Sequence, residues 1–316
     1  ILHKYTNLRT SKVLRCGDFI LFYFYFILCC LYKVVNKNFF FLKLCNIKYP
    51  RKNTIKIITI EIKMLAKVMA LLIAITNKYA KRIEKVQMSS IRIVMEKVEK
   101  LRNQGKSVVS LCAGEPDFNT PEGIKKATIE ALNDNQTHYS SNRGYLGLRQ
   151  KVSQLLKQQT TIDYDSDQEI IMTCGCSEAI NNTCQAFIDE GDEVIIFTPA
   201  FVSYQNTVLL CEGIPVEIPL KASNGFQIDI EELKSKITNK TKMMIINNPS
   251  NPTGAVYQKE TLEKVCQLAR ENNILILADE IYNQLDYEKQ YVSIASFENM
   301  KDYTIIVNGF SKAYAM

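Results

Sequence analysis

The stretches KMMIINNPSNPTG (residues 242–254) and ILILADEIY (residues 274–282) decide the fold class of this chain. Each opens with a nearly continuous apolar run, MMII or ILILA, of the kind found in strands that are buried on both faces of a sheet. A helical stretch separates the two runs. Apolar strands that alternate with helices predict a mostly parallel sheet with helices on both sides.

The same alternation extends outward from these stretches. Thr120-Pro121-Glu122 is a strong helix start, with a capping hydroxyl and a proline at the first helical position, and predicts a helix to about Leu132. Further helices are expected at Leu146–Gln159, Ser177–Ile188 and Lys259–Asn272. Strands are predicted at Glu169–Thr173, Glu193–Phe197, Pro215–Pro219, Lys242–Ile246, Ile274–Asp279 and Thr304–Asn308. The predicted fold class is therefore α/β, a doubly wound and mostly parallel sheet.

The chain before residue 120 is less regular. Apolar residues recur at helical spacing from Ile91 to Leu101, Gly105 is expected to cap that helix, and a short strand is predicted at Val108–Cys112. Residues 1–75 carry no consistent period. Their 14-residue apolar run, Phe19–Tyr32, is shorter than the roughly 20 residues of a membrane-spanning helix. It is either a signal anchor or part of translated flanking sequence, in which case Met64 or Met88 would be the start.

Composition narrows the class of protein. Hydrophobic residues make up 47% and charged residues 23% of the 316 residues, which suits a globular protein with a sizeable core. Residues 1–110 hold 22 Lys and Arg against 5 Asp and Glu, whereas residues 111–316 hold 17 against 28. The acidic second part argues against nucleic acid as a partner. The ten cysteines form no zinc-site spacing or disulfide framework, so we expect reduced thiols, no metal and a cytoplasmic location.

Polar residues follow the predicted strands at their carboxyl ends, where open α/β sheets bind ligands. These groups are Cys174-Gly175-Cys176-Ser177, Thr198-Pro199-Ala200-Phe201, the run from Asn247 to Gly254, Asp279 with Tyr282, and Ser311-Lys312. Each alone has an ordinary structural interpretation. Together they supply a lysine, an acid, a phosphate-sized turn and ring-holding groups, which is the set that pyridoxal phosphate requires.

Five motifs, in order, carry a family resemblance. AGEPDFNTP (113–121), HYSSNRGYLGLR (138–149), NNPSNPTG (247–254), ADEIY (278–282) and NGFSKAYAM (308–316) resemble class I pyridoxal-phosphate-dependent aminotransferases of the aspartate aminotransferase fold. The resemblance covers the chain from about residue 90 to its last residue. It implies the large domain of that fold over residues 121–316, an N-terminal arm with a piece of the small domain over 76–120, and a non-family segment over 1–75.

The resemblance also implies roles for single residues. Lys312 would be the Schiff-base lysine and the proton shuttle, and Asp279 would pair with the pyridine nitrogen of the cofactor. Gly114 would lie under the substrate carboxylate. The other implied cofactor-binding residues are Tyr282 and Asn251 at the ring oxygen, Phe201 against the ring, Gly175, Cys176 and Ser177 around the phosphate, Ser311 beside the lysine, and Tyr139 at the phosphate of a neighbouring subunit.

The implied activity is transfer of an amino group from an amino acid to a 2-oxo acid, in a homodimer and without a role for membranes. Three departures from the family stand out. Gly309 replaces a phosphate-binding serine, Cys176 replaces a smaller residue, and Ser177-Glu178 replaces the Lys-Gln often seen in aspartate-type bacterial relatives, which leaves the substrate open.

Relatives continue past the lysine with arginines for the phosphate and the substrate. We therefore expect a fragment, incomplete at its C-terminus, that folds poorly and is inactive alone. Alternatives are a β-lyase or aminocyclopropane-carboxylate synthase of similar fold, an aminotransferase-like regulatory domain, or an inert gene fragment.

Overall fold

The computed structural model describes Lys67, residues 80–86 and residues 90–316. The chain divides into two compact units, Ile1–Ala80 and Lys81–Met316, and the fold described below belongs to the second. Except for Lys67, the predicted segment 1–75 lies outside the described residues, and so does its apolar run. Within the described part of the chain, no helix is both long enough and apolar enough to cross a membrane.

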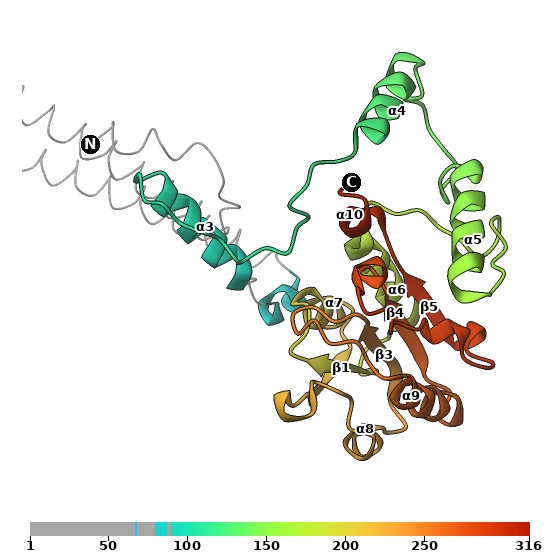
Figure 1. Ribbon diagram of the computed structural model, residues 1–316. Helices are drawn as coiled ribbons and strands as arrows, with labels where there is room; N and C mark the ends of the chain where they lie inside the picture. The colour runs from blue at the N-terminus through green and yellow to red at the C-terminus, as the bar shows by residue number, and fades with distance from the viewer. Residues whose placement is uncertain (1–66, 68–79, 87–89) are drawn as a thin grey trace, which may run out of the picture. The chain divides into compact units, whose positions relative to one another are not determined.

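The second unit is built on a five-stranded sheet with the strand order β2-β1-β3-β4-β5 (Figure 1). All four neighbouring pairs are parallel, as predicted. The strands are β1 (Glu193–Thr198), β2 (Ile214–Pro219), β3 (Thr241–Asn247), β4 (Leu275–Asp279) and β5 (Thr304–Val307). Because every crossover returns the chain in the same direction, the carboxyl ends of all five strands lie along one edge of the sheet.

Helices cover both faces of this sheet, which confirms the doubly wound prediction. Alternate residues of β1 enter two separate apolar clusters: Ile195 and Phe197 join one, and Val194 and Ile196 join the other. The helices of the unit are α3 (Ser90–Arg102), α4 (Glu122–Asn133), α5 (Leu146–Thr160), α6 (Cys176–Phe187), α7 (Ser203–Leu210), α8 (Ile230–Lys236), α9 (Lys259–Glu271) and α10 (Phe310–Ala313). Short 3-10 turns are η2 (Lys81–Lys85), η3 (Ala222–Asn224), η4 (Asn283–Leu285), η5 (Ile294–Ser296) and η6 (Lys301–Tyr303).

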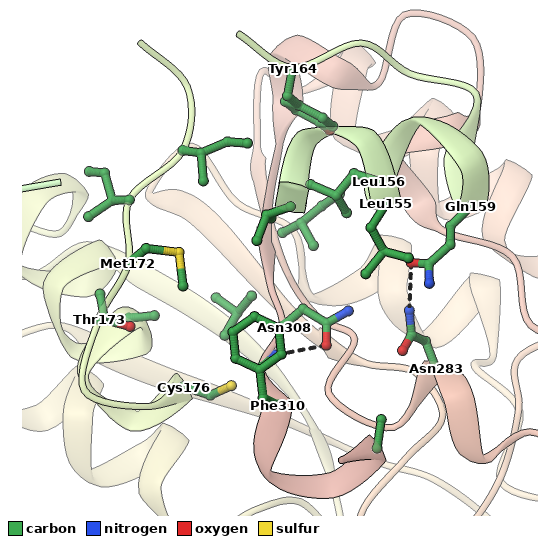
Figure 2. A pocket seen from close by; sticks show the side chains of 18 of the residues that line it. Leu155, Leu156, Gln159, Tyr164, Met172, Thr173, Cys176, Asn283, Asn308 and Phe310 are labelled. Atoms are coloured by element: carbon green, nitrogen blue, oxygen red, sulfur yellow. Dashed lines mark hydrogen bonds between the residues drawn. The ribbon is translucent and has the colours of Figure 1, made fainter. Parts of the chain in front are cut away.

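The strand predicted at Glu169–Thr173 is wrong, since these residues form a turn and an irregular segment. They are separated from the outer edge of β5 by a cavity of about 550 Å³, which Leu155 and Leu156 of α5 also line (Figure 2). The amide of Met172 donates to the carbonyl of Arg143 instead of to a strand. The segment has the apolar composition of a strand but no neighbouring strand to pair with, and a strand requires such a ladder.

Two expectations near residue 120 are also corrected. Residues 108–112 form no strand and pair with none. The Thr120 hydroxyl does not cap α4, where Pro121 occupies the cap position; it donates to the carbonyl of Ala315, close to the far end of the chain. The loop before α4 therefore lies against the segment that carries Lys312.

One acid is completely enclosed at the carboxyl end of β4. The Glu280 carboxylate accepts a hydrogen bond from the Ser293 hydroxyl at 2.8 Å and another from the Ile294 amide at 3.3 Å. Burial raises the pKa of Glu280 to about 7, although these bonds and the nearby Tyr291 phenol oppose the rise. The neighbouring Asp279 charge raises it further. Glu280 thus fastens the loop through residues 291–294 to the end of the strand.

Glu280 should make the stability of the fold depend on pH. The folded chain keeps a proton that the unfolded chain releases between pH 4.5 and 7, so the contribution is favourable at low pH and is lost as the pH rises through this range. Glu280→Gln keeps an acceptor oxygen but cannot ionise. Relative to the wild type, we expect the free energy of unfolding of Glu280→Gln to be higher at pH 8 than at pH 5, by up to about 3 kcal/mol. Urea titrations of both proteins at both pH values measure this difference. Parallel pH profiles for the two proteins would contradict this assignment.

Candidate active site

The carboxyl ends of β3 and β4 are tied together by one asparagine. Asn247 lies opposite Asp279 in the register of these strands. Its side-chain amide donates to the Asp279 main-chain carbonyl at 2.9 Å, and its side-chain oxygen accepts from the Asn251 amide at 2.7 Å. The turn that carries Asn251 is therefore fixed to the residue that carries the acid.

Asp279 is a buried acid with few donors. Only 4% of the residue is exposed. Its carboxylate accepts from the Tyr204 hydroxyl at 2.5 Å and from the Ile281 amide at 3.3 Å. Burial raises the pKa of Asp279, and these two bonds act in the opposite direction. None of the ion pairs among the described residues includes Asp279, so its carboxylate lacks a cationic partner there.

Lys312 lies close to the phenol and the amide that the sequence placed beside it. Its amine is 5.7 Å from the centre of the Tyr282 ring and donates to the carbonyl of Gly114. The Asn251 side chain donates to the Tyr282 hydroxyl at 3.3 Å. Burial and the Asp279 charge raise the pKa of Tyr282, whereas the bond from Asn251 lowers it. One region at the carboxyl ends of the strands thus holds the side chains of Lys312, Tyr282, Asn251 and Asp279.

Phe201, which is predicted to stack on the cofactor ring, lies next to Tyr204, the hydrogen-bond donor to Asp279. Phe201 follows β1 and is half-buried. It contacts Tyr204 edge to face, with ring centroids 5.6 Å apart and planes at 81°. This contact connects Phe201 to Asp279 through a single side chain.

The N-terminus of α6 supplies a seat for an anion. Gly175 caps the helix with φ of +87°, a conformation that residues with a side chain rarely adopt. The amides of Glu178 and Ala179 bond to the Gly175 carbonyl, while those of Cys176 and Ser177 donate to no main-chain carbonyl among the described residues. Free amides and the positive end of a 12-residue helix favour a phosphate at this position.

Not all of the predicted residues converge. Tyr139 is fully exposed on the surface of the unit, and Ser311 and Ser177 are also exposed. Gly114 reaches the site only through its carbonyl, which accepts from Lys312. Cys176 does belong to the site, because the charges of Asp279 and Lys312 both affect its thiol.

Two residues of this network were given no individual role from the sequence: Tyr204 was not named, and Asn247 was named only as the start of the polar run 247–254. Tyr204 lies one helical turn beyond Phe201, and Asn247 ends a strand directly beside Asp279. The available signals were the three-residue spacing of two aromatic residues, Phe201 and Tyr204, and the polar residue that closes an apolar strand. Both signals become informative only once the strand order places β1, β3 and β4 side by side.

The residues present suit a cofactor that has a phosphate, a basic ring nitrogen and an aldehyde. The α6 amides that have no main-chain acceptor would hold the phosphate. The Asp279 carboxylate, which lacks a cationic partner among the described residues, would hold a protonated ring nitrogen, and Lys312 would supply an amine. A parallel α/β sheet with this set at its strand ends is the arrangement that binding of pyridoxal phosphate requires.

Comparison with known proteins gives the family. The family model for aminotransferases of class I and II matches residues 106–316, so the chain belongs to this family. An aspartate aminotransferase of Pyrococcus abyssi is 44% identical over 212 residues. The aromatic-amino-acid aminotransferase 2 of Thermococcus litoralis is 42% identical over 237 residues. A solved structure of Thermus thermophilus aspartate aminotransferase with maleate superposes with a TM-score of 0.72 at 38% identity.

These matches cover most of this chain but only part of each relative. The match to the Pyrococcus protein takes in 67% of this chain and 54% of that protein. The match to the Thermococcus protein takes in 74% of this chain and 60% of that protein. For the Thermus structure the shares are 75% and 62%. The chain therefore spans between half and two thirds of the length of these relatives.

Removal of the Tyr204 hydroxyl should destabilise the site. Tyr204→Phe leaves a buried carboxylate oxygen of Asp279 without its donor, which costs about 1–3 kcal/mol. The loss should be larger where Asp279 is ionised than where it is protonated, because only the ionised carboxylate needs both donors. Urea unfolding over a range of pH values measures it. Tyr287→Phe removes a hydroxyl from an 89% exposed residue and should change nothing. An equal, small effect of both substitutions would contradict a role for Tyr204.

Proposed function

We propose that this chain is the cofactor-binding part of an aminotransferase that moves an amino group from an amino acid to a 2-oxo acid by means of pyridoxal phosphate. One observation carries the proposal: the Lys312 amine, the buried Asp279 carboxylate and the free amides of α6 lie at the same strand ends. Relatives named as aspartate and aromatic-amino-acid aminotransferases support amino transfer over a lyase reaction.

Each residue has a distinct task in this proposal. Pyridoxal phosphate supplies an aldehyde that bonds amines and a ring that accepts electron density. Asp279 keeps a proton at the ring nitrogen, and Tyr204 in turn holds the carboxylate of Asp279 in place. Lys312 carries a proton to and from the reacting carbon of the substrate, which requires a free amine within reach.

Tyr282, Asn251 and Phe201 orient the ring. The 3.3 Å bond between Asn251 and Tyr282 directs the phenol, and the edge-to-face contact with Tyr204 orients Phe201. Gly175, Cys176 and Ser177 surround the phosphate, with Ser311 next to the lysine, and the Gly114 segment borders the substrate carboxylate.

The rest of the assembly is also a proposal. We propose a homodimer in which exposed Tyr139 reaches the phosphate at the partner's site, and a division of the chain at residues 75 and 120. The cavity lies along β5, an edge strand of the sheet. We propose that it receives a strand from the part of the relatives' length that this chain does not span. The cysteine pattern of the sequence supports a cytoplasmic location.

Covalent capture of the cofactor tests the proposal. The chain should form a pyridoxal phosphate adduct that borohydride makes permanent, and mass spectrometry of the digested protein should place it on Lys312. Lys312→Ala should reduce the adduct at least about tenfold, to the level of scattered surface lysines. Lys242→Ala, at an exposed lysine of β3, is the matched control and should leave it unchanged. An adduct on another lysine that stays at the level of the unchanged chain in Lys312→Ala would refute the assignment.

A further inference from the structure

The space around Gly309 is tight. This glycine precedes α10 with φ of −172° and ψ of 174°, an extended backbone that any residue can adopt. A Cβ atom added at this position would lie 3.0 Å from the sulfur of Cys176 and 3.2 Å from the Cδ1 of Ile281. Both separations are shorter than ordinary van der Waals contact, so a larger residue requires its neighbours to move.

The sulfur that occupies this space belongs to the first residue of α6. Cys176 is half-buried and packs against the apolar cluster between α6, α7 and the sheet. Figure 2 shows Cys176 at the start of α6 and Phe310, which follows Gly309, near the same end of the cavity. Burial raises the pKa of the Cys176 thiol to about 11, the Asp279 charge raises it further, and Lys312 opposes both. The thiol is therefore neutral at physiological pH.

We propose that Cys176 and Gly309 form one coupled pair that shapes the phosphate seat, in which the sulfur fills the space that a side chain at position 309 would take. The proposal rests on the proposed function, because the seat is the one assigned to pyridoxal phosphate.

The pair also determines how the anion is held. Glycine at position 309 has no side-chain donor for a phosphate oxygen, and the neutral Cys176 thiol is a weak donor. The α6 amides and the lysine must then supply most of the attraction. Cys176 acts as a positioning residue by closing one wall of the seat without adding negative charge.

A double-mutant cycle tests the coupling in the 316-residue chain. The proteins are wild type, Cys176→Ala, Gly309→Ser and the double variant, and the first measurement is the urea midpoint without cofactor. Gly309→Ser should destabilise the chain, and the double variant should recover part of that loss, since removal of the sulfur makes room for the new side chain. Additive effects of the two substitutions would overturn the steric coupling, whether or not the chain binds a cofactor.

Two matched controls separate this coupling from general effects. Gly123→Ser adds a side chain where a Cβ meets nothing within 4 Å, and should not destabilise the chain through a clash. Cys184→Ala removes another buried thiol from α6. Combined with Gly309→Ser, it should be additive. Recovery of stability by Cys184→Ala as well would show that the effect is not specific to the pair.

The affinities for pyridoxal phosphate and for pyridoxal then show whether the pair acts at the phosphate seat. Gly309→Ser should weaken the binding of pyridoxal phosphate by about 5- to 20-fold, with partial rescue in the double variant, and change the affinity for pyridoxal, which lacks the phosphate, by less than about twofold. Equal losses for both ligands would overturn the placement of the pair at the phosphate seat. Failure of the unchanged chain to bind pyridoxal phosphate would refute the proposed function and this placement, while the cofactor-free cycle would still decide the coupling.

Discussion

A carboxylate buried at the end of a parallel strand must be supplied with hydrogen-bond donors, and the site depends on how Asp279 receives them. The Tyr204 hydroxyl reaches it from α7, and the Ile281 amide reaches it from the following turn. Neither donor is cationic. The result is a buried acid with a raised pKa that a positively charged ring nitrogen would stabilise.

The strand order makes this arrangement possible. With β3 between β1 and β4, the Asn247 side chain connects the β4 carbonyl of Asp279 to the Asn251 turn. Phe201 and Tyr204 enter from the β1 side, and Glu280 fastens the following loop to the opposite side. Lys312 arrives after β5, the edge strand, and contacts Tyr282. The candidate site thus lies where the segments that follow β1, β3, β4 and β5 come together, at the ends of apolar strands that are packed on both faces.

The sequence predicted the parts of the fold that depend on local pattern. The runs MMII and ILILA formed β3 and β4, and the helix beginning near Lys259 was placed to within one residue. Residues 169–173 had the same composition but formed no strand, because a strand also needs a neighbour and β5 lies across a cavity. The Thr120 hydroxyl bonded to Ala315 instead of capping α4, a long-range contact that no local rule contains. Tyr204 was missed for the same reason, since its partner lies 75 residues away. The roles of the site residues remain predictions.

The proposed chemistry of the site depends on Asp279 holding a protonated ring nitrogen. The most direct measurement is a nitrogen NMR spectrum of the chain loaded with pyridoxal phosphate that carries ¹⁵N in its ring. We predict the chemical shift of a protonated pyridine nitrogen at pH 8 in the unchanged chain and that of a neutral nitrogen in Asp279→Asn. A neutral ring nitrogen in the unchanged chain would contradict the account.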